Sequence, residues 1–119
     1  MPVSLQEFEK ALKALQEALT EPKTSIVRDA TIQRFEFCVE LAWKTSKKLL
    51  GTMSTSPKPL IREMAQAGLI EDPEEWFGYL EARNLSVHTY KEELAEKVYG
   101  ITKVFLPSAQ DLLSKMRTK

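Results

Sequence analysis

The chain has 119 residues, which is enough for one domain with its own hydrophobic core and too few for a second folded unit. Hydrophobic residues make up 43% and charged residues 29%, a balance that is ordinary for a globular protein and excludes an intrinsically disordered one. The 17 basic and 17 acidic residues cancel, so any contact with nucleic acid would need a local cluster of positive charge.

Cysteine content and the N-terminal sequence indicate a cytoplasmic protein. Cys38 is the only cysteine, so it cannot form an internal disulfide bond, which suits a reducing compartment. The N-terminal residues lack the basic stretch and apolar run of a signal peptide. No apolar stretch approaches the roughly 20 residues that a membrane span requires. We therefore expect a cytoplasmic location and no association with a membrane.

The first helix is predicted from a start signal, an apolar stripe and a proline. Ser4 and Glu7 have the spacing of a capping box, and Pro22 should end the helix. Between them, apolar residues recur every three or four positions, as on one face of a helix. This stripe consists of Leu5, Phe8, Leu12, Leu15 and Leu19.

A longer helix is predicted over residues 24–50, with Gly51 as a left-handed C-cap. Phe37 and Leu41 lie nearly opposite its main apolar stripe, so the helix should pack on two sides. One side would face the bundle core, and the other could face a second subunit. The main stripe consists of Ile32, Phe35, Val39, Ala42, Ser46 and Leu49.

Two further starts follow a polar linker at residues 52–56. Ser56 before Pro57 predicts a short helix that ends near residue 67, before Gly68. Asp72 and Glu75 match a capping box for the next helix. That helix should direct four apolar side chains toward the core, namely Trp76, Phe77, Leu80 and Val87.

Thr89 and Glu92 match another capping box, which predicts a break near residues 88–89 and a last helix to about residue 116. Pro107 should kink this helix. Its stripe consists of Leu94, Val98, Ile101, Phe105 and Leu112. No strand-like alternation is present. The fold class is therefore all-α, an antiparallel up-and-down four-helix bundle with one additional short helix, in a single domain over residues 1–119.

Several common kinds of active site are excluded by the sequence. There is no glycine-rich phosphate loop, and one cysteine with one histidine cannot make a usual zinc site. No Gly-Ser pair is present, so the phosphate-binding start of a nucleotidyltransferase active site is missing. We therefore expect no metal and no cofactor. The buried Cys38 should be an inert thiol, and the aromatic residues Phe35, Phe37, Trp43, Trp76 and Tyr79 should serve packing, an interface or a cleft wall.

The segment from Arg83 to Tyr90 breaks the expected pattern. Arg83 and Asn84 stand where the apolar stripe of the preceding helix should continue, and such violations tend to mark functional or strained sites. The alternative is that Arg83 extends along the helix edge and pairs with Glu81 or Glu92, while Asn84 faces solvent.

The spacing of this segment adds a geometric condition. Asn84 and His88 are four residues apart and share a helix face, whereas Arg83 and His88 are five apart. Five residues correspond to a separation of about 140° around an ideal helix axis. Arg83 and His88 can therefore converge only if the helix ends before His88, or if a two-fold axis brings in a second copy.

The residue types suit metal-free cleavage of RNA. Histidine can move protons near neutral pH, and arginine can hold a phosphate and stabilise the charge of a phosphorane-like transition state. The ribose 2′-hydroxyl would be the internal nucleophile. An exposed tyrosine could stack on a base or be modified at its hydroxyl. The alternative is a histidine that only caps a helix end or lies at the surface.

The sequence resembles one branch of the HEPN-domain family. Arg83, His88 and Tyr90 fit its Arg-x4-His-x-Tyr motif, and residues 33–44, QRFEFCVELAWK, resemble its second helix. The branch is that of the nucleotidyltransferase substrate-binding proteins, whose HepT-like relatives are toxins. The resemblance extends from about residue 5 to residue 116.

This resemblance implies a homodimer that binds a minimal nucleotidyltransferase encoded nearby, as in a toxin–antitoxin system. Arg83 and His88 would be catalytic in a metal-independent ribonuclease site at the dimer cleft, with Asn84 supporting them and RNA as the substrate. The partner enzyme would attach AMP to Tyr90. Two alternatives remain, a non-catalytic accessory subunit that binds substrate for the nucleotidyltransferase, and a structural helical dimer with a degenerate site.

Overall fold

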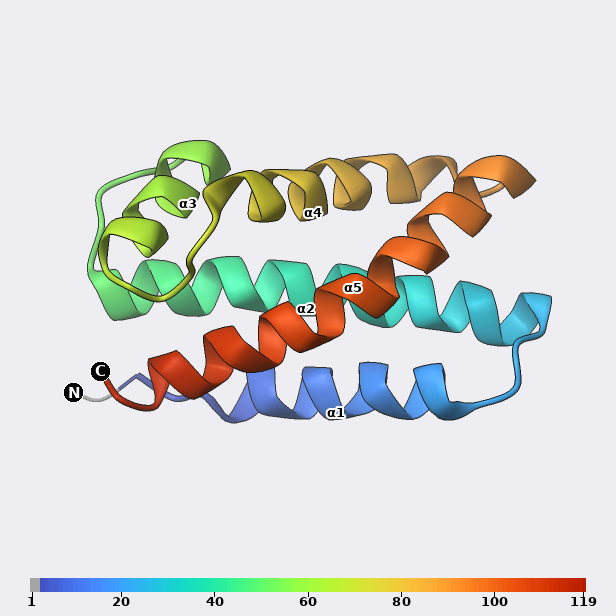
Figure 1. Ribbon diagram of the computed structural model, residues 1–119, viewed down its shortest axis with the longest axis horizontal. Coiled ribbons are helices and arrows are strands. Elements are labelled where there is room, and N and C mark those ends of the chain that lie inside the picture. The colour runs from blue at the N-terminus through green and yellow to red at the C-terminus, as the bar shows by residue number, and fades with distance from the viewer. Residues whose placement is uncertain (1–2) are drawn as a thin grey trace.

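Four long helices alternate in direction along the chain, and a computed structural model describes residues 3–119 (Figure 1). α2 lies between α1 and α4, and α5 crosses α2 from the end of α4 to the start of α1 (Figure 1). The short helix α3 lies beside the start of α4, and no strand occurs within residues 3–119. The predicted all-α, up-and-down bundle with one additional short helix is confirmed. The helices are α1 (Gln6–Thr20), α2 (Ser25–Leu50), α3 (Pro57–Gln66), α4 (Pro73–Leu85) and α5 (Glu92–Met116), with a 3₁₀ turn η1 (Ser86–His88) between α4 and α5.

Local signals at three helix ends confirm predicted boundaries. The Thr24 side chain accepts a hydrogen bond from the Val27 amide at 3.1 Å and caps α2. Gly51 closes the same helix with a positive φ of 59°, a conformation that glycine adopts without steric cost. Asp72 caps α4 by accepting a hydrogen bond from the Glu74 amide at 2.9 Å.

The three predicted capping boxes are wrong in detail. α1 begins after Leu5 and not after Ser4, and the Ser4 hydroxyl accepts only a long hydrogen bond, at 3.4 Å, from the Gln6 amide. α5 begins after Lys91, because the Thr89 hydroxyl donates to the Ser86 carbonyl at 2.9 Å and belongs to the preceding turn.

Glu75 also makes no capping contact. Its carboxylate instead accepts hydrogen bonds from the hydroxyl groups of Tyr79 and Ser108, which join α4 to α5. These bonds, from Ser108 first and then Tyr79, lower the pKa of Glu75. At Thr89 and at Glu75, a competing contact took the residue that the pattern assigned to a cap.

Aromatic rings fill the centre of the bundle between α2, α4 and α5. The ring centroid of Phe105 lies 5.0 Å from that of Phe35, 5.1 Å from Tyr79 and 5.7 Å from Trp76. The planes of these pairs are close to perpendicular, the edge-to-face arrangement that aromatic rings prefer. Phe105 is fully buried, so this cluster fixes α4 against α2 and α5.

One predicted core residue lies outside the core. Val87 is 63% exposed. α4 ends at Leu85, and the tighter 3₁₀ turn that follows rotates each residue further around the axis than an α-helix does, so position 87 leaves the stripe. Tyr79 and Ala82 are buried from this helix instead. α5 continues across Pro107, and the kink there remains a prediction.

A nearly buried arginine ties the start of α5 to the start of α2. Arg28 Nη1 lies 2.5 Å from Glu92 Oε1 and 3.1 Å from Glu96 Oε2, while Arg28 Nε bonds Asp29 Oδ1 at 3.0 Å. Lys23 also pairs with Glu96, and the two cations lower the pKa of the Glu96 carboxyl. This cluster fixes where α5 begins.

In the described residues, no helix has the length and apolar character needed to cross a membrane.

The aromatic cluster predicts a large loss of stability on truncation. Phe105→Ala should lower the free energy of unfolding by about 3–5 kcal/mol, because it removes a buried ring and leaves a cavity. Val104→Ala, at an exposed neighbouring position, should change it by less than about 0.5 kcal/mol. Urea denaturation followed by circular dichroism measures both. Equal stability of the two variants would contradict the packing described here.

Candidate functional site

The break between α4 and α5 lies close to the position that the sequence predicts. α4 ends at Leu85, and residues 86–88 form a single 3₁₀ turn. The Lys91 amide donates to the His88 carbonyl at 3.0 Å and closes the connection. The helix therefore ends before His88, which meets the first of the two geometric conditions set by the five-residue spacing.

His88 and Tyr90 lie together at the surface of this connection. The Tyr90 hydroxyl is 3.4 Å from His88 Nδ1, and the two rings meet nearly edge to face at 6.0 Å between centroids. Tyr90 is 77% exposed and His88 is exposed as well. The chain has three tyrosines, all within residues 3–119, and Tyr90 is the exposed one, since Tyr79 and Tyr99 are buried. Both the imidazole and the phenol can be reached from solvent or by a partner.

Arg83 points toward α2 and is held there by a carboxylate. Its Nη1 lies 3.4 Å from Glu36 Oε2. The Arg83 side chain is 33% exposed and the Glu36 side chain is 25% exposed. The Ser86 hydroxyl lies 2.5 Å from the same Glu36 oxygen and 2.6 Å from the Arg83 carbonyl, and its proton can be donated to either. The alternative pairing of Arg83 with Glu81 or Glu92 is wrong. α4 turns Arg83 toward α2, and Glu92 is bound by Arg28.

The helix break alone does not join the two motif residues. Arg83 has Glu36 as its partner and His88 has Tyr90, and within residues 3–119 no hydrogen bond connects Arg83 to His88. Only the second condition, a contribution from another copy of the chain, could therefore bring Arg83 and His88 together.

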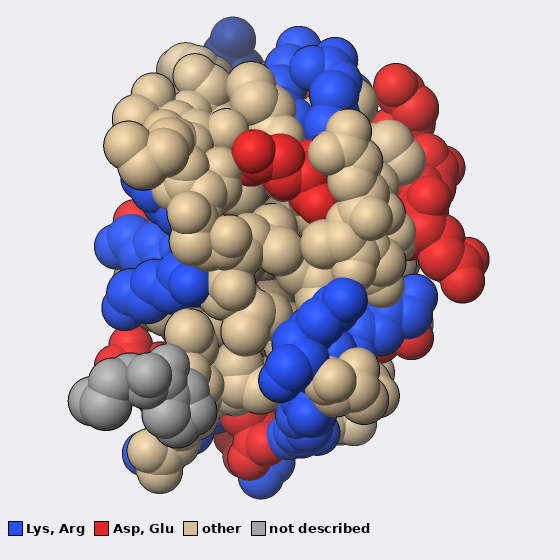
Figure 2. Space-filling view, turned by 90° about the vertical axis from the view of Figure 1, so that its left-hand side faces the viewer, with Lys and Arg blue, Asp and Glu red and all other residues tan. Residues whose placement is uncertain are grey.

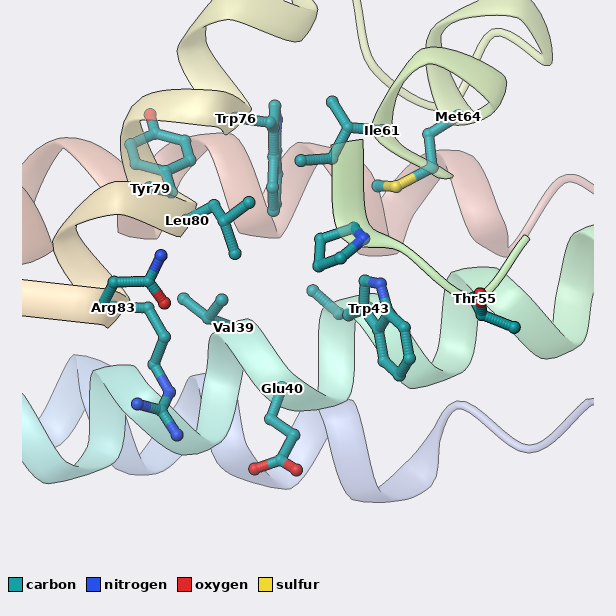
Figure 3. Close-up of a pocket in the computed structure, with 13 residues that line it drawn as sticks. Val39, Glu40, Trp43, Thr55, Ile61, Met64, Trp76, Tyr79, Leu80 and Arg83 are labelled. Carbon is teal, nitrogen blue, oxygen red and sulfur yellow. The ribbon is translucent and has the colours of Figure 1, made fainter. Parts of the chain in front are cut away.

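Asn84 and Arg83 border a groove of 390 Å³ between α2 and α4 (Figure 3). Val39 and Trp43 line it from α2, while Trp76 and Leu80 line it from α4 (Figure 3). α3 closes one end with Ile61 and Met64. The prediction that Trp76 and Tyr79 belong to the core or a cleft wall is confirmed, since both are buried and both border the groove.

Two residues of the site were missed in the sequence. Glu36 and Ser86 orient Arg83, and although both lie within the two stretches that resemble the family, neither is a defining position of its Arg-x4-His-x-Tyr motif. The sequence did contain one signal. A charged arginine within an apolar stripe favours an acidic partner on the facing helix, and Glu36 is an acidic residue between two phenylalanines of that helix.

Within residues 3–119, no three His, Cys, Asp or Glu side chains are grouped so as to hold a metal ion. Burial raises the pKa of the Cys38 thiol to about 12, as expected for an inert thiol.

Comparison with known proteins places the chain in a family. The family described as "Nucleotidyltransferase substrate binding protein like" matches residues 3–118. A protein from Haemophilus influenzae described as "Probable ribonuclease HepT" is 36% identical, and the alignment covers 80% of this chain and 73% of that relative.

Two solved structures have the same fold. A crystal structure of a Thermus thermophilus protein has a TM-score of 0.86 and 35% identity, over 92% of this chain and 98% of that one. A protein from Haemophilus influenzae, described as having the fold of a substrate-binding domain of a nucleotidyltransferase, has a TM-score of 0.87 and 29% identity, over 96% and 99%. The chain therefore belongs to the nucleotidyltransferase substrate-binding protein family, the HepT-like branch of HEPN proteins that its motif resembles.

Proposed function

We propose that this chain is the cytoplasmic partner subunit of a minimal nucleotidyltransferase in a two-component system, and that it carries a metal-independent ribonuclease site made of Arg83, Asn84 and His88. The observation that carries the proposal is the break between α4 and α5, which leaves His88 and Tyr90 exposed and adjacent. The 36% identity to a probable ribonuclease supports the same activity.

The proposed reaction needs only protein side chains, the RNA itself and water. A base, His88, takes the proton of the ribose 2′-hydroxyl, whose oxygen attacks the adjacent phosphorus. The bond from phosphorus to the 5′-oxygen breaks, and that oxygen takes a proton from solvent water, which can reach the exposed site. The products are a 2′,3′-cyclic phosphate and a 5′-hydroxyl end. Arg83 stabilises the charge that develops on the phosphoryl oxygens, and the Asn84 amide orients the strand.

The site is proposed to be completed by a second copy of the chain. Within the described part of one copy, no hydrogen bond joins Arg83 to His88, whereas a two-fold axis could bring Arg83 of one copy to His88 of the other. Arg83 and His88 also have separate partners within one copy. A homodimer whose axis passes beside the connection would place Arg83 of one copy against His88 of the other.

Tyr90 is the proposed point of control by the partner. Its hydroxyl oxygen would attack the α-phosphorus of ATP bound to the nucleotidyltransferase, pyrophosphate would leave, and the phenolic proton would be lost. The resulting AMP group would lie against His88, because the two side chains are already in contact. A bulky anion there would block the histidine and repel the phosphate of an RNA strand.

The second candidate is an accessory subunit that binds substrate for the nucleotidyltransferase without cleaving RNA. The structural match to a substrate-binding domain of a nucleotidyltransferase favours it. The groove beside Asn84 would then serve the partner's substrate.

The ribonuclease proposal predicts the loss of RNA cleavage in two variants. His88→Ala and Arg83→Ala should each slow cleavage of a single-stranded RNA by about 100-fold or more, because proton transfer and charge stabilisation each contribute at least that much. Glu93→Gln, at an exposed position of α5, should leave the rate unchanged. Cleavage is measured with a chelator present, and mass spectrometry should find the cyclic phosphate. Wild-type rates in both folded variants would overturn the proposal.

The modification proposal predicts a mass increase of one AMP per chain after incubation with the partner nucleotidyltransferase, ATP and magnesium. Tyr90→Phe should abolish this increase, because it removes the attacking oxygen. Tyr99→Phe is the matched control, since Tyr99 is only 5% exposed and should be out of reach. Intact-protein mass spectrometry measures both. An adduct on Tyr90→Phe at the wild-type rate would rule out Tyr90 as the acceptor.

A further inference from the structure

We infer that the groove between α2 and α4 binds an unpaired nucleobase of a single-stranded RNA whose backbone passes Arg83. This inference rests on the proposed ribonuclease function and names the part of the substrate that the site grips. His88 and Tyr90 do not line the groove, whereas Arg83 and Asn84 do, so the groove adjoins the proposed reaction site without containing its base.

The lining of the groove has the character of a stacking site. Trp43 stands on one wall, and Trp76 with Leu80 stands on the other (Figure 3). Aromatic and branched apolar side chains hold the faces of unpaired bases, because every base has a flat π-surface. The volume of 390 Å³ lies at the small end of the range for small-molecule sites, about 300–1,000 Å³. A single base fits this size better than a drug-sized ligand does.

Trp43, which lines the groove, has a buried polar atom that lacks a partner. The indole Nε1 of Trp43 is buried and makes no hydrogen bond within the described part of the chain. In Figure 3 the nitrogen-bearing edge of this ring is the one nearer to Ile61 and Trp76. An indole N–H can only donate, and leaving it buried without an acceptor costs free energy. Carbonyl oxygens and ring nitrogens at the edge of a nucleobase are acceptors of the required kind.

Asn84 supplies the complementary group at the other end of the groove. Its amide offers both a donor and an acceptor, so it can pair with the edge of a base. Asn84 follows Arg83 directly, and Arg83 also borders the groove. A base bound in the groove would therefore place its own phosphate near the guanidinium group that the proposed reaction uses.

Although the whole chain is neutral, Arg83 lines the groove, Lys47 packs on its Trp43 wall, and Lys58 and Arg62 belong to α3, the helix that closes one end. Lys47 Nζ lies 5.1 Å from the centre of the Trp43 ring, and Arg62 lies 5.3 Å from the Phe77 ring. Lys58 lies 6.0 Å from that same ring. Figure 2 shows both Lys or Arg and Asp or Glu side chains around an uncharged surface at the end of the molecule where α3 lies.

The acidic side chains nearest the groove are already paired. Glu40 pairs with Lys44 at 3.3 Å, and Glu36 pairs with Arg83. Cations placed next to aromatic rings are the usual features of a surface that follows a single strand. This arrangement favours an RNA strand over a neutral ligand or an apolar peptide.

Both tryptophans of the chain line this groove, so intrinsic fluorescence reports on it directly. The probe is a short 2′-O-methylated single-stranded RNA, which cannot be cleaved because it has no free 2′-hydroxyl. It should quench the fluorescence in a saturable manner. The same strand with an abasic site in its centre should bind about tenfold more weakly, because one stacked base contributes about 1–3 kcal/mol. Equal binding of the two strands, or binding without quenching, would overturn the inference.

Variants separate this inference from the catalytic proposal. Trp43→Leu should weaken binding of the intact strand about tenfold and remove the advantage over the abasic strand. Phe37→Leu changes another aromatic residue of α2 that lies outside the groove and is 54% exposed, and it should bind as the wild type does. His88→Ala should keep full binding while it loses cleavage. If His88→Ala still cleaved RNA, the catalytic proposal would be contradicted, while the inference about the groove would stand.

Two further outcomes would also count against the inference. ATP that quenches the fluorescence at the same concentration as the RNA would assign the groove to a mononucleotide. A change from dimer to monomer in Trp43→Leu, seen by light scattering, would assign this face to contact between copies. Binding of the strand by stable, dimeric wild type and its selective loss in Trp43→Leu would support the inference.

Discussion

The carboxylate of Glu36 joins α2 to the end of α4, and the geometry of the candidate site depends on this contact. It holds the Arg83 guanidinium and lies 2.5 Å from the Ser86 hydroxyl, so one side chain contacts the last turn of α4 and the first residue of η1. The Arg28 cluster fixes the start of α5 on the other side. The short connection between these two anchors has little freedom, and it therefore presents His88 and Tyr90 at the surface in one arrangement.

The same contact has a consequence for RNA binding. Glu36 neutralises Arg83 in the free protein, and an incoming phosphate would compete with this carboxylate for the guanidinium group. A partly exposed ion pair of this kind contributes little to stability, so its replacement by a phosphate costs little. The pair keeps Arg83 oriented toward the groove between α2 and α4, where Asn84 also lies. The arginine side chain is flexible, so without this pair its guanidinium group would not be held in position before a phosphate binds.

Much of the fold was predictable because its signals are local. Proline and glycine limit the backbone whatever surrounds them, so Pro57, Gly51 and the Asp72–Pro73 pair marked helix ends correctly. The capping boxes failed because a side chain such as Glu75 can exchange a cap for a tertiary partner. Val87 failed because an apolar period of 3.6 residues does not continue through a 3₁₀ turn.

The candidate site was only partly predictable for a related reason. Its motif residues stand within one short stretch of sequence, and the resemblance to HEPN proteins identified them. Their environment is built by residues far away in the chain, such as Glu36 and Trp43 on α2, which approach Arg83 and Asn84 only when α2 packs against α4. No local pattern encodes such a contact. The proposed contact with a second copy is harder still to predict, since it needs surface complementarity as well as the fold.

The central claim is that Arg83 and His88 act across two copies of the chain, and mixed dimers test it directly. Arg83→Ala and His88→Ala subunits are each inactive as homodimers in this account. When equal amounts are unfolded and refolded together, half of the dimers should be mixed, and each mixed dimer has one site with both groups intact. Cleavage should then return to about a quarter of the wild-type rate. A mixture that remains as inactive as the separate variants, with mixed dimers detected by native mass spectrometry, would contradict the claim.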